Sequence, residues 1–339
     1  MTGTLIETSK GKQAVEDIQA GDTLMVYRHG KTETCRVIWT GHQHTIVNMS
    51  LPEDEAGYPV RVSKDAISEG VPYKDMLVTA EHCLFFDGKF IPVRMLVNGK
   101  SIAYDYTITA YDYYHVETET HSIINADGVL TESYLNTGNR NRFCQDDGIF
   151  RLSHEVKTWA NDAAAPLTTT RQHVEPVFKQ IAARTGINMG KHRFIQDHDC
   201  HLETLSGTSI RPIRTVKNRL IFMIPSCVNA FHLVSRSSRP SDVVGPFVDD
   251  RRQLGVCVGE ISLQIGTKEL LVTPHLQQQP CSGWHNGDVS DDTRWTDGCA
   301  LLMLPKHNAA KAIFLSIEIR AAGPYLMEHA VENGRRLSA

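Results

Sequence analysis

Long apolar runs and an excess of basic charge are both missing from this sequence. No uninterrupted apolar stretch reaches the roughly 18 residues that a membrane-spanning helix needs, so no membrane span is predicted. Lys and Arg total 35 against 39 Asp and Glu, which gives a net charge of −4 and argues against nucleic acid as a partner. The first residues show no basic segment followed by an apolar core, so no secretory signal is visible. As printed, the sequence predicts a cytoplasmic protein. Secretion or surface attachment stays open if the chain begins further upstream.

The cysteines also lack a pattern. There are eight, and no two of them form a C-x-x-C pair. A chain of this length does not need disulfides to hold a core, and scattered cysteines are typical of buried free thiols in a reducing compartment. We therefore predict no bound metal and no cofactor.

What the chain does contain is short alternating runs separated by Gly, Asp and Asn turns, a pattern typical of β-structure. With 339 residues, it is long enough for two domains. We predict a mainly β first domain over residues 1–143, a linker over 144–170, and a second domain over 171–330. The second domain is expected to begin with an amphipathic helix at Arg171–Thr185 and to continue as a β-sandwich. The apolar face of that helix comprises Val174, Val177, Phe178, Ile181 and Ala182.

The most informative stretch runs from Asp75 to Gly88 and reads as strand, polar turn and strand, closed by Asp87-Gly88. Thr79 and His82 lie three residues apart between its two apolar runs. A hydroxyl and an imidazole so placed can bind one peptide group and protonate its nitrogen as it leaves. Taken alone, a T-x-x-H pattern is more often a turn with a capped hydroxyl, so its neighbours decide between the two readings.

Those neighbours resemble a known family. The matching stretches are Gly3–Thr8, Val15–Ile18 with Gly21-Asp22, Leu77–Phe85, Arg94–Gly99, Tyr114–Glu117 and His121 through Glu132 to Arg140. In this order they resemble a Hint module, the fold shared by inteins and the hedgehog autoprocessing domain, in its bacterial Hint-2 form. The resemblance implies an all-β horseshoe of short, curved hairpins.

The resemblance also implies a chemistry and roles for particular residues. In Hint modules a Cys or Ser attacks the preceding carbonyl, and Thr79 and His82 match the positions that activate that amide. His121 is the candidate for a second, assisting histidine, with His115 as the alternative. Splicing by Asn cyclisation is not expected, because Glu132-Ser133 stands where a terminal His-Asn would lie.

The nucleophile is the main departure from the family pattern. The family's Cys would lie a few residues ahead of Gly3, where this sequence has only Met1 and Thr2, and a Thr hydroxyl is a weak substitute. We expect either a degenerate copy or a longer reading frame that begins with Cys ahead of Gly3. The partner of the reaction would be the protein's own upstream segment.

The second domain offers a weaker candidate for binding. Two tryptophans on predicted loops stand near polar side chains that could bind a sugar's hydroxyl groups. The residues are Trp284, His285, Arg294, Trp295 and Asp297. We favour the alternative that they form a core tryptophan and a turn.

Three functions follow as hypotheses. The first is self-cleavage at the N-terminal junction by an N-to-S or N-to-O acyl shift. The second is a non-catalytic Hint scaffold joined to a sandwich that binds a glycan or a protein. The third, a hydrolase in the second domain, lacks a nucleophile elbow or a paired-carboxylate pattern to support it.

Overall fold

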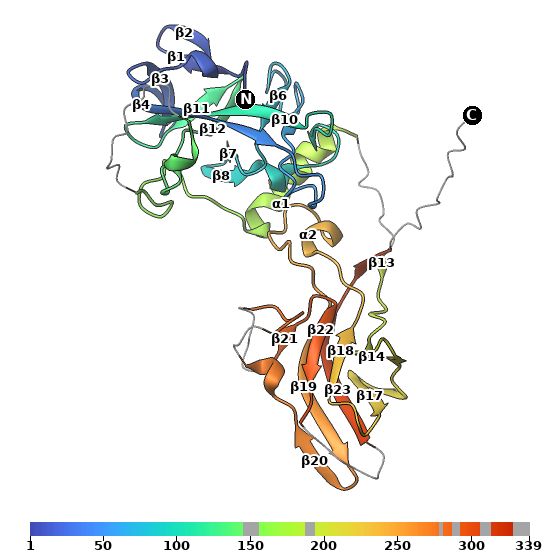
Figure 1. The fold of residues 1–339 in the computed structure, drawn as a ribbon. Helices are drawn as coiled ribbons and strands as arrows, with labels where there is room; N and C mark the ends of the chain where they lie inside the picture. The colour runs from blue at the N-terminus through green and yellow to red at the C-terminus, as the bar shows by residue number, and fades with distance from the viewer. Residues whose placement is uncertain (145–155, 187–193, 278–280, 287–291, 306–312, 328–339) are drawn as a thin grey trace, which may run out of the picture. The chain divides into compact units, whose positions relative to one another are not determined.

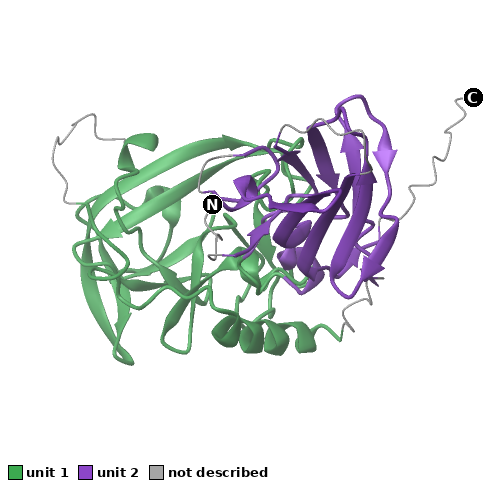
Figure 2. Ribbon diagram, turned by 90° about the horizontal axis from the view of Figure 1, so that it is seen from below, with its two compact units in different colours: residues 1–189, 246–249 green, residues 190–245, 250–339 purple. Residues whose placement is uncertain are grey.

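The computed structural model describes residues 1–144, 156–186, 194–277, 281–286, 292–305 and 313–327. The chain divides into two compact units, residues 1–189 with 246–249 and residues 190–245 with 250–339 (Figure 2). Within the described residues, no helix is both long and apolar enough to cross a membrane.

The first unit is an antiparallel β-structure with one long helix (Figure 1). Its elements are β1 (Leu5–Thr8), β2 (Gly11–Ala14), β3 (Thr23–Arg28), β4 (Lys31–Ile46), β5 (Val60–Val62), β6 (Met76–Val78), β7 (Cys83–Phe86), β8 (Lys89–Pro92), β9 (Ile102–Tyr104), β10 (Ala110–Thr118), β11 (Ile123–Ala126), β12 (Val129–Glu132) and α1 (Arg171–Arg184), with 3-10 turns η1 (Val15–Asp17), η2 (Val93–Leu96) and η3 (Arg140–Arg142).

The strands form one large curved sheet and one small one. The large sheet runs β10-β4-β3-β1-β11-β12-β7-β8, with β2 beside β1, and the small sheet runs β6-β5-β9. The long strand β4 changes partner along its length: residues 31–36 pair with β3, and 37–46 pair with β10. This arrangement confirms the predicted all-β first domain of short hairpins.

Two Asp-Gly pairs make the tight turns that close these hairpins. Asp87 and Gly88 between β7 and β8, and Asp127 and Gly128 between β11 and β12, all have positive φ. Type I′ turns need this conformation at both central residues, and their twist matches that of the flanking strands. The two-residue turns fix the register of both hairpins.

Helix α1 has the predicted buried face, but it belongs to the first unit. Val174, Val177, Phe178, Ile181 and Ala182 are all buried in the same hydrophobic cluster as Leu24 and Leu84. The Phe178 ring lies 5.2 Å from that of Phe247, and Lys100 Nζ donates to the Thr185 carbonyl at the end of the helix. The sequence placed this helix at the start of the second domain, because periodicity shows that a face is buried but not what buries it.

The predicted linker, like α1, proves to be part of the first unit where it is described. Residues 145–155 of the expected linker 144–170 lie outside the described part. The rest is held against the first unit: Phe90 exchanges backbone hydrogen bonds with Pro166 and Thr168 at 2.9 Å each, and the Trp159 ring packs 5.9 Å from the Phe90 ring. Residues 156–168 are therefore a strap on the first unit.

The second unit is a β-sandwich, as predicted, with a core of its own. Its sheets run β15-β14-β18-β22 and β16-β17-β23-β19-β20, with β21 beside β19 and a separate β13-β24 ribbon. Leu202, Phe231 and Leu302 from the first of these sheets share one cluster with Phe222, Val258 and Leu315 from the second. The elements are β13 (Phe194–Ile195), β14 (His201–Thr204), β15 (Ser209–Ile210), β16 (Arg214–Val216), β17 (Arg219–Ile224), β18 (Ala230–Val234), α2 (Pro240–Val243), β19 (Val256–Ile265), β20 (Lys268–Leu271), η4 (Pro274–Leu276), β21 (Arg294–Trp295), β22 (Cys299–Met303), β23 (Ile313–Ala322) and β24 (Tyr325–Leu326).

The assignment of α1 to the first unit can be tested with Phe178→Ala. Truncating a fully buried phenylalanine costs about 3 to 5 kcal/mol through lost burial and the cavity left behind. We expect faster native-state hydrogen exchange in β8 and η2, with no change in β19 of the other unit. Gln180→Ala, at an exposed position of the same helix, should change neither. Faster exchange confined to β19 would contradict the assignment.

Candidate functional site

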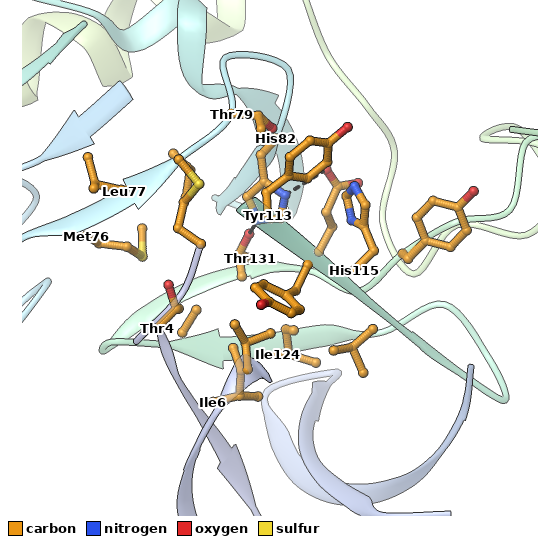
Figure 3. A pocket seen from close by; sticks show the side chains of 18 residues that line it. Thr4, Ile6, Met76, Leu77, Thr79, His82, Tyr113, His115, Ile124 and Thr131 are labelled. Atoms are coloured by element: carbon orange, nitrogen blue, oxygen red, sulfur yellow. Dashed lines mark hydrogen bonds and ion pairs between the residues drawn. The ribbon is translucent and has the colours of Figure 1, made fainter. Parts of the chain in front are cut away.

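A pocket in the first unit brings together the start of the chain and the central T-x-x-H turn (Figure 3). Met1, Thr79, His82 and His115 all line it. Its apolar walls come from β1, β6 and β11 and include Ile6, Met76, Leu77 and Ile124. The first residue of the sequence thus reaches the histidine of the middle hairpin.

Backbone hydrogen bonds fix the turn that carries Thr79 and His82. The His82 N–H donates to the Thr79 carbonyl at 3.1 Å, and the Val93 N–H donates to the His82 carbonyl at 2.9 Å. The Thr79 side chain lines the pocket, and its hydroxyl has no hydrogen-bond partner among the described residues. That hydroxyl is open to a ligand.

The His82 ring is held in one orientation by Thr131 on β12. Thr131 Oγ1 donates to the Cys83 carbonyl at 2.7 Å and lies 2.5 Å from His82 Nε2. Because the hydroxyl proton is used on the carbonyl, Nε2 carries a hydrogen and donates it to Oγ1. The other nitrogen, Nδ1, is left as the one that can take up or release a proton.

Electrostatics keep both pocket histidines neutral. Burial lowers the pKa of His82 to about 3, and His115 and the N-terminal amine push it in the same direction. Burial and the same amine lower the pKa of His115 to about 4. The amine's own pKa falls to about 6 because it is buried, although the carboxylates of Glu16 and Asp127 oppose that fall.

A set of hydrogen bonds holds the chain start against the pocket. The Gly3 N–H donates to both carboxylate oxygens of Glu16 at 2.9 Å, and Lys74 Nζ donates to the Gly3 carbonyl at 2.7 Å. The Leu5 N–H donates to Asp127 Oδ1 at 3.0 Å. Gly3 has a φ of +77°, a conformation that glycine adopts without strain.

His121, the first choice for the assisting histidine, does not line the pocket. Its Nδ1 accepts the Ala164 N–H and its Nε2 donates to the Ser133 carbonyl, both at 2.9 Å. The ring packs 5.5 Å from those of Phe90 and Trp159. With both nitrogens bonded and only 3% of the residue exposed, His121 ties the strap to the sheet, and His115 is the histidine beside His82.

Sequence reasoning missed Thr131 and did not give Glu132 a role in the pocket. Both line it, because β12 pairs with β7 so that Thr131 lies opposite Leu84. The Cys83 N–H donates to Glu132 Oε1 at 2.8 Å. Only the long-range register of these strands reveals the contacts, and no local motif carries it.

The candidate binding residues of the second unit are largely structural. Trp284 is 5% exposed and its Nε1 donates to the Leu301 carbonyl at 2.8 Å. Arg294 is fully buried and donates to the carbonyls of His275, Gln277 and His285.

The other three have local partners. His285 Nε2 donates to the Gln253 carbonyl at 2.7 Å, and Trp295 pairs with Cys257 in the sheet. Asp297 accepts the Cys299 N–H at 2.8 Å. Trp284 fits the core interpretation, because a buried tryptophan cannot stack on a sugar, whereas Trp295 is half-buried.

No metal site accompanies the pocket. Among the residues that the structure describes, no three His, Cys, Asp or Glu side chains gather in a way that could hold a metal ion.

The first unit is thus a mainly β domain whose pocket gathers Thr79, Thr131, His82 and His115 beside the start of the chain. Residues 1–138 match the family described as the Hint domain, and this part of the chain is a Hint domain. No curated protein matches the chain significantly.

Solved structures of intein type also match. They include the MchDnaB-1 intein, in two structures with 15% and 14% identity and a TM-score of 0.27 each, and a bacterial intein-like domain from Clostridium thermocellum with 16% identity and a TM-score of 0.28. Each match covers 39% of this chain and 96% of the other. The family assignment rests on the sequence match of residues 1–138.

The buried neutral state of His121 makes stability depend on pH. Burial lowers its pKa from 6.5 to about 4, so its contribution to stability is complete above pH 6.5 and is lost as the pH falls toward 4. Between pH 7.5 and 5 this costs about 2 kcal/mol. We expect the stability of His121→Gln to fall by about 2 kcal/mol less than that of the parent over the same pH interval.

The measurement is the free energy of opening from hydrogen exchange in β11, corrected for intrinsic rates at each pH. Gln180→Ala, at an exposed position that carries no titratable group, serves as the control and should follow the parent. An identical pH dependence in His121→Gln and the parent would show that His121 does not titrate in this way.

Proposed function

We propose that the pocket activates a peptide bond at the N-terminal junction for self-cleavage of the Hint type, by an N-to-S or N-to-O acyl shift. The observation that carries this is the meeting of Met1, Thr79 and His82 in one pocket. His82 is also held by Thr131 with its Nδ1 free to exchange a proton. A catalytic acid must lie within reach of the group that it protonates, and the shared lining of one pocket supports the proposal on this point.

The proposed reaction has one bond formed and one broken. A thiol or hydroxyl at the junction loses its proton as it adds to the preceding carbonyl carbon, and the carbon–nitrogen bond then breaks as the nitrogen takes a proton from protonated His82 Nδ1, so one proton is released and one is consumed. The products are a thioester or ester and a free amine. The Thr79 hydroxyl would bind the reacting peptide group, while His115 shapes the other wall.

The nucleophile has to come from a position a few residues ahead of Gly3. In this sequence Met1 and Thr2 precede Gly3, and neither supplies a thiol, so the N-to-S shift requires a Cys there, while Thr2 offers only a weakly nucleophilic hydroxyl for the N-to-O shift. Asn cyclisation is not part of the proposal. Glu132 accepts the Cys83 N–H, and Ser133 Oγ accepts the Ser122 N–H at 2.9 Å, which gives both residues structural bonds. The scaffold alternative, with a glycan or protein ligand on the sandwich, has no observation in its favour here.

The test is a fusion of a reporter protein, Cys and two residues ahead of Gly3, with the rest of the chain intact. We expect dithiothreitol to release the reporter, because the thiol intercepts the thioester. General acid–base groups contribute about 10² to 10⁴ in rate, so His82→Ala should slow release at least about 100-fold, and Thr79→Ala should slow it less.

His121→Gln at pH 7.5 is the matched control, because it removes a histidine that lies outside the pocket; its release rate should stay near that of the parent fusion. The proposal would fall if the folded parent fusion stayed intact in dithiothreitol, or if His82→Ala released the reporter as fast as the parent.

A further inference from the structure

Glu132, the last residue of β12, has its carboxylate beside the working nitrogen of His82. Oε1 lies 3.7 Å from His82 Nδ1, and the two side chains are 14% and 19% exposed. The Cys83 N–H donates to the same oxygen at 2.8 Å. The carboxyl is therefore held in place by the backbone of the strand that follows His82.

The contact is longer than a hydrogen bond, and a proton on either group would make it attractive. Thr131 keeps a hydrogen on Nε2, so a neutral His82 presents the lone pair of Nδ1 toward Glu132. A lone pair that faces a largely buried carboxylate is repulsive, and the Cys83 N–H offsets only part of the carboxylate's charge. One proton, on the imidazole or on the carboxyl, removes that conflict.

The surroundings decide which group holds the proton. From β10, His115 faces His82, and the N-terminal amine faces both rings. The thiol of Cys83 faces Glu132 from β7. Within the described residues, no Lys or Arg forms an ion pair with Glu132. Burial raises the pKa of Glu132 to about 7 and, with these neighbours, lowers that of His82 to about 3.

For the proposed cleavage, the consequence is that His82 rarely carries the proton that it would have to donate. An imidazole with a pKa near 3 is protonated in only about one molecule in 10⁴ at pH 7. The leaving amide nitrogen needs a proton at that pH, and the nearest carboxyl that can store one lies against Nδ1.

We propose that Glu132 is the proton store for His82, delivering through Nδ1 the proton that the leaving amide nitrogen takes up. This inference rests on the proposed function. The carbon–nitrogen bond breaks as Nδ1 gives its proton to nitrogen, and Glu132 replaces that proton, becoming a carboxylate beside a neutral imidazole. The proton released by the attacking thiol or hydroxyl returns to the carboxylate, so no co-reactant is consumed.

Glu132→Gln tests the store while keeping the shape. The amide oxygen can still accept the Cys83 N–H, but the amide cannot supply a proton to Nδ1. In the reporter fusion we expect release to slow about 100-fold at pH 7. The parent's rate should fall as the pH rises past about 7, and this descending limb should vanish in the variant. Glu33→Gln, at an exposed carboxylate on β4, should keep both the rate and the limb.

A second measurement does not depend on cleavage. The ring nitrogens of ¹⁵N-labelled His82 should report an inflection near pH 7 as Glu132 titrates, and Glu132→Gln should abolish it. If His82→Ala blocks cleavage while Glu132→Gln keeps the parent's rate and pH profile, the store is wrong and the proposed function stands. If the parent fusion does not cleave, the proposed function fails. The inference then also falls unless the His82 inflection is present in the parent and absent in Glu132→Gln.

Discussion

One buried carboxylate holds the beginning of the chain where the pocket needs it. Asp127 sits in the turn between β11 and β12 and is 1% exposed. Its Oδ1 accepts the Leu5 N–H at 3.0 Å and the Tyr73 hydroxyl at 3.2 Å, and lies 3.2 Å from Lys74 Nζ. Two segments distant in sequence, one at Leu5 and one at Tyr73 and Lys74, converge on this one group. A buried charge is tolerated only when it is paired and hydrogen-bonded. The groups that Asp127 positions are therefore the same groups that stabilise its own charge.

In the pocket, neutral groups are also held by hydrogen bonds from a segment distant in sequence. Thr131 bonds both the His82 ring and the Cys83 carbonyl, and Glu132 bonds the Cys83 N–H. Two successive residues of β12 therefore serve both the backbone and the imidazole of the neighbouring hairpin. The polar chemistry is carried by the strand pairing, and apolar walls from β1, β6 and β11 exclude water around it. Low polarity around the ring is what depresses its basicity.

Much of this could be predicted from local patterns. Asp87-Gly88 and Asp127-Gly128 marked tight turns, the 3.6-residue period of α1 identified its five buried residues, and T-x-x-H marked two pocket residues. What could not be predicted depends on contacts distant in sequence. The roles of Thr131 and Glu132 follow from the register of β12 against β7, and the preference for His115 over His121 follows from where each ring lies: His115 lines the pocket, and His121 packs against Phe90 and Trp159. Likewise, the full burial of Arg294 follows from the sandwich, whereas a core tryptophan such as Trp284 was the favoured interpretation of the sequence.

The strap and α1 show that the family match and the folded unit end at different residues. Sequence likeness to the Hint family ends at residue 138, yet Phe90 exchanges backbone bonds with Pro166 and Thr168, and the apolar side of α1 completes the cluster around Leu84. A fragment cut at residue 138 would present that cluster to water and leave the Phe90 backbone groups unpaired. The family match is thus shorter than the folded unit, because the later segment contributes Trp159, Ala165 and the apolar side of α1 to the interior of the first unit.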